Sequence, residues 1–165
     1  MNIRLLYWLL PIGWMGVIFQ SSSTPYTEQD IKPLMGEFID FSFLEPFVAW
    51  IHITYNGSPV SLETHGVDGL IEFFIRKGAH VFVFFLLACL FKLAIGQSTE
   101  LHVKRQLLLT FLLTAAYAVM DETHQGFTPN RTAYFGDVIL DSFGALLAVF
   151  LICLKIHYLD KKKEV

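Results

Sequence analysis

The chain has 165 residues, of which 54% are hydrophobic and 16% are charged, and its formal net charge at pH 7 is −3. An average soluble domain carries about 25% charged residues, so this composition, with a mean hydropathy of +0.51, excludes an ordinary soluble domain and indicates an integral membrane protein. The slightly acidic balance gives no indication of a nucleic-acid partner, because nucleic-acid-binding surfaces are basic.

Four apolar segments predict four membrane-spanning helices, since about 20 helical residues cross the hydrocarbon and backbone groups in lipid must bond within the helix. The first contains Pro11, which is expected to kink it. It resembles a signal sequence but lacks a clean small-residue cleavage site, so we expect it to remain as a span. We therefore predict an all-α membrane protein with residues 1–165 in a single domain. The expected spans are 5–20, 73–95, 104–122 and 136–158.

The distribution of lysine and arginine predicts the orientation of these helices. The loop 21–72 contains one basic residue, Lys32, whereas the amino terminus, the connection 96–103 with its flanks and the carboxyl tail are basic. Because positively charged short loops stay in the cytoplasm, both termini are expected to be cytoplasmic. Residues 21–72 and 123–135 are then expected to face outward.

The long outer loop 21–72 is expected to form one or two amphipathic helices that lie in the membrane interface, a depth that suits Trp50 and Tyr55. Its YNGSP segment predicts a turn. Two interpretations of the loop remain open: a lid that packs over the helix ends, or a lid that also contacts a substrate. The apolar residues at roughly helical spacing are Leu34, Phe38, Phe41, Phe47, Trp50 and Ile51.

Polar residues gather at the predicted outer ends of three spans. The third span is expected to start near residue 104, and about 20 helical residues cross the membrane. Its last acidic residues, Asp121 and Glu122, are therefore expected at the depth of the outer leaflet. The first turns of the second and fourth spans are expected at the same depth. Residues four apart share a helical face, and such pairs recur on all three helices. Small residues at Gly144, Ala145 and Ala148 permit close packing, so the acidic face of the fourth span is expected to point inward. The nine candidate binding residues are Arg76, Lys77, His80, Asp121, Glu122, Gln125, Arg131, Asp137 and Asp141.

Charged groups at this depth usually line a site or a cavity, although a salt-bridge network that fixes helix register is the alternative. The basic members suit a phosphate, and the carboxylates suit amine or hydroxyl groups. If the site is catalytic, Glu122, His80 and Asp121 are the candidates, with Glu122 and His80 as a general base and its partner. A serine from SSSTP is a further candidate nucleophile.

We predict no metal and no cofactor. Histidine, aspartate and glutamate can bind a divalent ion, but the chain has no HExxH motif and DETHQ has no recognised ligand spacing. The two cysteines, Cys89 and Cys153, lie within apolar runs and are interpreted as packing residues rather than a disulfide or a metal pair.

The motifs of these segments resemble those of the VanZ-like family of small bacterial membrane proteins. The first span ends in a Ser-Ser-x-x-Pro-type segment at Ser21–Pro25, and the second carries Lys-x-x-His followed by Phe84. The pattern has Asn where this chain has Asp141, and His124 is not counted as a family residue. The third and fourth spans carry D-E-x-x-Q-x-F-x-P-x-R and a later acidic and glycine pattern, at Asp121, Glu122, Gln125, Phe127, Pro129, Arg131, Asp137, Asp141 and Gly144.

The resemblance implies a multi-pass protein of the bacterial cell membrane that acts in envelope physiology or in teicoplanin-type glycopeptide resistance. The expected partners are membrane lipids and a lipid-linked cell-wall precursor or a glycopeptide, because these meet at the outer face. The alternative is a membrane-embedded hydrolase or transferase that acts on a lipid head group. A proton-coupled carrier is disfavoured because the cytoplasmic halves of the spans contain few polar residues. The sequence leaves the reaction, the ligand and the oligomeric state open.

Overall fold

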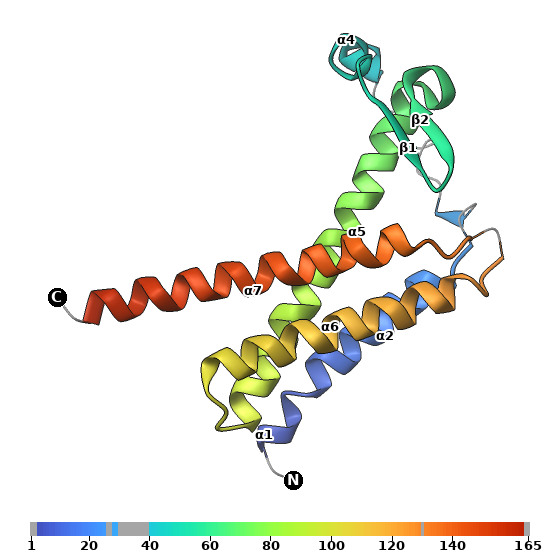
Figure 1. Cartoon of the computed structure of the whole chain (residues 1–165). Helices are drawn as coiled ribbons and strands as arrows, with labels where there is room; N and C mark the ends of the chain where they lie inside the picture. The colour runs from blue at the N-terminus through green and yellow to red at the C-terminus, as the bar shows by residue number, and fades with distance from the viewer. Residues whose placement is uncertain (1–2, 26–27, 30–39, 130, 164–165) are drawn as a thin grey trace.

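The computed structural model describes residues 3–25, 28–29, 40–129 and 131–163. Four helical segments are long and apolar enough to cross a membrane, which confirms the four predicted spans. The elements are α1 (Ile3–Leu6), α2 (Leu9–Ser23), the 3₁₀ turn η2 (Phe41–Leu44), α4 (Glu45–Val48), β1 (His52–Tyr55), β2 (Ser58–Ser61), α5 (Leu62–Ser98), α6 (Val103–Gln125) and α7 (Phe135–Lys163) (Figure 1).

The first span is broken between α1 and α2, close to the kink expected at Pro11. The helix stops at Leu6 and resumes at Leu9, so that Pro11 falls in the first turn of α2. A proline is tolerated there because the N–H that it lacks would have no partner within the helix. Its ring, however, would clash with the carbonyl of Tyr7, four residues earlier, if the helix continued through that residue. The break therefore lies before the proline rather than at it.

The second span begins much earlier than residue 73. Helix α5 has 37 residues, and at 1.5 Å per residue it is about 55 Å long, against about 30 Å of hydrocarbon. Ser61 and Thr64 form a capping box at its start, and Gly66, with a φ of 67°, marks a kink after the first turn. Because this cap starts a helix without needing lipid, hydropathy alone missed the polar first part of α5.

The segment between α2 and α5 contains a β-hairpin, so the chain is mostly rather than wholly helical. The turn expected in YNGSP is present, since Asn56 and Gly57 both have positive φ, as a tight hairpin turn requires. Strands β1 and β2 pair antiparallel on either side of it. Among the described residues of this segment, the expected amphipathic helix corresponds to the short turns η2 and α4, and Phe47 and the nearby Trp50 are exposed. Leu34 and Phe38 lie outside the described residues.

Helices α5 and α7 approach each other closely. A Cβ atom at Gly144 would overlap the carbonyl oxygen of Val81, so only glycine fits this contact. Ala145 and Ala148, on the same side of α7, are buried against Ala88 of α5. This confirms that the small residues of α7 face the bundle, as close packing of membrane helices requires.

The long helices alternate in direction, and this brings their polar ends together. At one end the Trp8 indole donates a 3.0 Å hydrogen bond to Ser98 Oγ. At the opposite end the last residues of α2 and α6 meet the first turns of α7, while α5 crosses the other three helices (Figure 1). We call this second end the charged end. The start of α1 and the end of α7 lie away from it (Figure 1).

Candidate binding site

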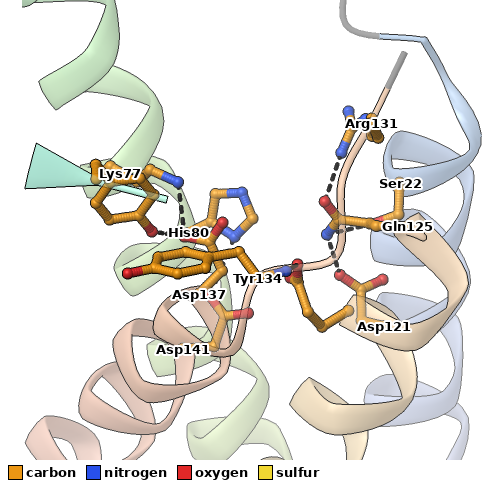
Figure 2. A network of polar contacts seen from close by, with 11 residues as sticks. Ser22, Lys77, His80, Asp121, Gln125, Arg131, Tyr134, Asp137 and Asp141 are labelled. Atoms are coloured by element: carbon orange, nitrogen blue, oxygen red, sulfur yellow. Dashed lines mark hydrogen bonds and ion pairs between the residues drawn. The ribbon is translucent and has the colours of Figure 1, made fainter. Parts of the chain in front are cut away.

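All nine residues expected to form the site lie at the charged end. The predicted convergence of three helices is therefore observed, and the loop after α6 contributes to it. Figure 2 shows the labelled residues in two groups, one on either side of Tyr134. The contributions are Arg76, Lys77 and His80 from α5, Asp121, Glu122 and Gln125 from α6, Arg131 from the following loop, and Asp137 and Asp141 from α7.

The first group joins α5 to α7 through two direct contacts between a basic side chain and a carboxylate, and we call it the α5–α7 group. Lys77 Nζ lies 2.6 Å from Asp137 Oδ1, and His80 Nδ1 lies 3.1 Å from Asp141 Oδ1. The Tyr55 hydroxyl also donates to Asp137 Oδ1, and Lys77 Nζ lies 4.2 Å from the centre of the Tyr55 ring. Each of these two carboxylates therefore has a basic partner within reach.

Tyr55, whose position in the sequence suits the membrane interface, also belongs to this group. The β-hairpin carries it to the first turn of α7, where its ring also packs edge-to-face on Tyr134 at 4.8 Å between centroids. Burial, followed by the hydrogen bond to Asp137, raises the pKa of the Tyr55 hydroxyl, which therefore stays a neutral donor. Its ring supplies a face for the ammonium of Lys77.

The second group joins α2 to α6, and we call it the α2–α6 group. Gln125 stands between two opposite charges in it: its Nε2 donates to Asp121 Oδ2 at 2.8 Å, and its Oε1 accepts from Arg131 Nη1 at 2.9 Å. Gln125 Nε2 also lies 3.5 Å from Ser22 Oγ, a long contact that ties α6 to the end of α2. The acid and the base are thus connected through an amide and not paired directly (Figure 2).

The charge of Arg131 is held by neutral oxygen atoms. Besides Gln125, its guanidinium donates to the backbone carbonyls of Thr24 at 3.1 Å and Ser21 at 3.3 Å, and to Gln29 Oε1 at 2.5 Å. No carboxylate of a described residue lies within ion-pair distance of it. Burial, and then the nearby charge of Arg76, lowers the pKa of Arg131 below its usual value, but an arginine remains charged in proteins.

Three carboxylates at the charged end are almost fully buried. Asp121, Glu122 and Asp141 have exposed fractions of 2%, 4% and 0%. In each, one oxygen has a partner and the other has none among the described residues. Glu122 Oε1 accepts from the backbone N–H of Tyr134 at 2.5 Å. These oxygens make the electrostatic potential at the centre of the charged end negative.

Two pairings considered from the sequence are absent from the described contacts. His80 bonds to Asp141 and not to Glu122, so the expected base and partner are not in hydrogen-bond contact. Ser22 contacts Gln125 and Thr128 rather than His80. Within the described part of the chain, no group of three His, Cys, Asp or Glu side chains is arranged to hold a metal ion.

Two cavities open at the charged end, and they share Arg76, His80 and Arg131. The larger, of about 400 Å³, lies among α5, the hairpin and the loop after α6. The smaller, of about 230 Å³, lies between α2 and α5 and reaches Asp121 of α6. Ligand pockets of roughly 300–1,000 Å³ are usual in proteins, so the two cavities together have a suitable size for a small molecule.

Sequence reasoning missed Glu72, which is buried and forms an ion pair with Arg76. The distance from Arg76 Nη2 to Glu72 Oε1 is 2.5 Å. The signal was available, because the two residues are four apart and α5 extends through both. It was missed because the expected helix began one residue too late to include Glu72. Tyr55 and Gln29 had no such signal, since their positions depend on tertiary contacts.

A bundle of four long apolar helices with charged cavities at one end defines a multi-pass membrane protein. The chain belongs to the VanZ/LLP1 family, whose model matches residues 7–156. The match includes every residue of the candidate site and confirms the resemblance seen in its motifs. Searches of curated proteins and of solved structures found no match.

Proposed function

We propose that this protein binds the head group of an outer-leaflet lipid or lipid-linked precursor in a bacterial cell membrane and thereby controls its exposure. Both termini are cytoplasmic in this proposal, and the charged end faces outward. The family match supports it, as does the excess of lysine and arginine at the end of the bundle that carries the termini. Resistance to a teicoplanin-type glycopeptide is the expected phenotype, because such drugs meet their targets at the outer face.

The observation that carries the proposal is the charge lining of the larger cavity. Among the described residues, five basic side chains, two of them histidines, and two acidic ones line it. The buried acids Glu122 and Asp141 lie behind this lining and are not among the residues that face it. The cavity wall is therefore more positive than the charged end as a whole, which favours a phosphate in the cavity.

Inhibitory concentrations of teicoplanin and vancomycin in a susceptible Gram-positive host test this function. We expect the full chain to raise the teicoplanin value alone, and Glu122→Gln and His80→Ala to abolish the rise at equal protein level. Glu63→Gln, a change at an exposed acid in the first turn of α5, is the matched control and should keep the rise. An unchanged value with well-expressed protein would contradict a role in glycopeptide defence.

A hydrolase or transferase that acts on a lipid head group is the second candidate. One observation favours it: His80 lines both cavities while its Nδ1 lies 3.1 Å from the buried Asp141. A carboxylate that orients a histidine is a common arrangement for a general base. This candidate predicts a changed lipid or cell-wall product, lost in His80→Ala, in mass spectra of overexpressing cells. Unchanged spectra would remove it and leave the binding function.

A further inference from the structure

The smaller cavity has apolar walls along most of its depth. Trp14, Val17 and Ile18 of α2 form one wall, and Val83 and Phe84 of α5 form the other. The Trp14 indole donates a 3.1 Å hydrogen bond to the Val83 carbonyl, which joins the two walls. Both walls belong to predicted spans, so the cavity lies beside the hydrocarbon of the bilayer. Its lower part suits a hydrocarbon chain and offers little to a polar ligand.

The mouth of the same cavity is cationic. Among the described residues, three basic side chains, Arg76, His80 and Arg131, line it together with one acidic side chain, Asp121. Arg131 donates only to neutral oxygens there. Arg76 already has the Glu72 carboxylate as a counter-ion at 2.5 Å, so the guanidinium of Arg131 is the main attraction for an anion in this cavity, with Arg76 beside it. A phosphate is the anion whose geometry suits two arginines.

The larger cavity adjoins the smaller one at these arginines and has a more polar lining. Arg76, His80 and Arg131 line both cavities, so they stand where an apolar compartment meets a polar one. The larger cavity adds hydroxyl, amide and aromatic groups from Tyr55, Asn56, Thr64, Thr132 and Tyr134. Such groups suit the polar remainder of a head group.

We propose that the two cavities together bind a phosphate-bearing amphiphile, with one hydrocarbon chain between α2 and α5, the phosphate between Arg76 and Arg131, and the rest of the head group in the larger cavity. This inference rests on the head-group binding proposed above and adds the chain. The order of the three compartments matches the order of chain, phosphate and head group in a membrane lipid. A phospholipid and a lipid-linked cell-wall precursor share this chemistry.

Binding to the purified full chain in detergent tests the inference, with three probes that separate its parts. They are a short-chain phosphatidylglycerol, glycerol phosphate without a chain, and the matching diacylglycerol without phosphate. We expect the first to bind at least about tenfold more tightly than glycerol phosphate, since burying two methylene groups already gives about that factor. It should also bind more tightly than the diacylglycerol, which lacks the phosphate that the arginines would hold. Arg131→Gln should weaken only the probes that carry phosphate.

A matched pair of variants tests the chain compartment. Ala79 lines the smaller cavity and Ala116 is an exposed residue of α6 that lines neither cavity. Ala79→Phe should reduce the affinity for phosphatidylglycerol by at least about tenfold, from the loss of the same methylene burial, whereas Ala116→Phe should leave it unchanged. Gel filtration and circular dichroism of both variants show whether the fold is kept.

The outcomes separate this inference from the proposed function. If glycerol phosphate binds as tightly as phosphatidylglycerol and Ala79→Phe has no effect, the chain compartment is wrong and the phosphate site stands. If the phosphate probes bind no better than diacylglycerol and Arg131→Gln changes nothing, both fail. Native mass spectrometry of protein extracted from cells identifies the source: a retained phospholipid or polyprenyl-phosphate mass supports the inference, and a retained neutral lipid alone contradicts it.

Discussion

The two groups of the charged end handle opposite charges in different ways. In the α5–α7 group, Lys77 meets Asp137 and His80 meets Asp141 directly, at 2.6 and 3.1 Å. In the α2–α6 group, Gln125 separates Arg131 from Asp121 and bonds to both. The same classes of side chain are present on each side of Figure 2, but only one side neutralises them in contact.

This difference matches the packing beneath each group. Under the direct pairs, α5 and α7 are in close contact at Gly144 and Ala145. Near the amide-bridged pair, the smaller cavity opens between α2 and α5, although these helices still pack together through Ile18 and Phe84. Direct ion pairs at low dielectric set the register of two helices, whereas an arginine held by neutral oxygens keeps its charge available for a ligand. We therefore interpret the direct contacts of the first group as holding α5 to α7, and Arg131 of the second group as the charge most available to a ligand.

The largest effect is expected on breaking a direct pair. Asp137→Ala leaves Lys77 largely buried without its carboxylate and removes the acceptor of the Tyr55 hydroxyl. Unfolding in detergent should show a loss of about 3–5 kcal/mol. Asp160→Ala, at an exposed position near the end of α7, should change stability by less than about 0.5 kcal/mol.

Adding Lys77→Met to Asp137→Ala checks the cause. The second change removes the charge left without a partner, so part of the lost stability should return. Equal losses in the single and double variants would show that the pair does not hold α5 to α7.

The helix contact under the direct pairs gives the next largest effect. Gly144→Ala places a methyl group against the Val81 carbonyl and should destabilise the protein by up to about 3 kcal/mol. Gly78→Ala, on α5, adds a methyl group with no atom within 4 Å and should stabilise the helix by about 0.5–1 kcal/mol. The same unfolding assay compares them, and equal effects would contradict the close contact.

The architecture that positions the site could be predicted from the sequence. The number of spans follows from the apolar segments, and the face of α7 that carries small residues follows from the helical spacing of those residues. All nine site residues reach the same end for the same reason. The partner of each basic residue could not be predicted in the same way. Several acidic residues were expected at about the same depth in the membrane as Lys77 and His80. Choosing Asp137 and Asp141 requires the α5–α7 contact, which depends on a backbone approach at Gly144.

The hairpin shows the limit of a pattern-based prediction. The turn at Asn56 and Gly57 was recognised, but strands of four residues are too short to be told from an interfacial helix by hydrophobic spacing. The hydrogen bond of Tyr55 with Asp137 was consequently not predicted. Only the paired strands carry it there.

Removing the amide bridge should have a moderate effect on stability. Gln125→Leu keeps most of the side-chain volume but leaves Asp121 Oδ2 without its donor. A loss of about 1–3 kcal/mol is expected from one buried acceptor without a partner. Because Arg131 retains its other acceptors, binding of a phosphate probe should weaken less than in Arg131→Gln. The reverse order would contradict the role given to Arg131.

The smallest effect is expected for Tyr55→Phe, which keeps the ring over Lys77 and removes one hydrogen bond. The loss should be about 1 kcal/mol near neutral pH. Because burial and Asp137 raise the pKa of Tyr55 in the folded state, its contribution is present below the unfolded value of about 10 and falls as the pH rises above it. The difference between the two proteins should therefore narrow above pH 10, and a difference that widens there would contradict this assignment.

Labelling of single cysteines in intact cells tests most directly whether the charged end faces outward. In a Cys89→Ala and Cys153→Ala background, Thr132→Cys places a thiol at the larger cavity, and Lys161→Cys places one on an exposed residue near the opposite end. A membrane-impermeant maleimide should label the cysteine at 132 in intact cells and the cysteine at 161 only after permeabilisation. Labelling of position 161 in intact cells, with position 132 protected until permeabilisation, would place the site in the cytoplasm and contradict the proposed function.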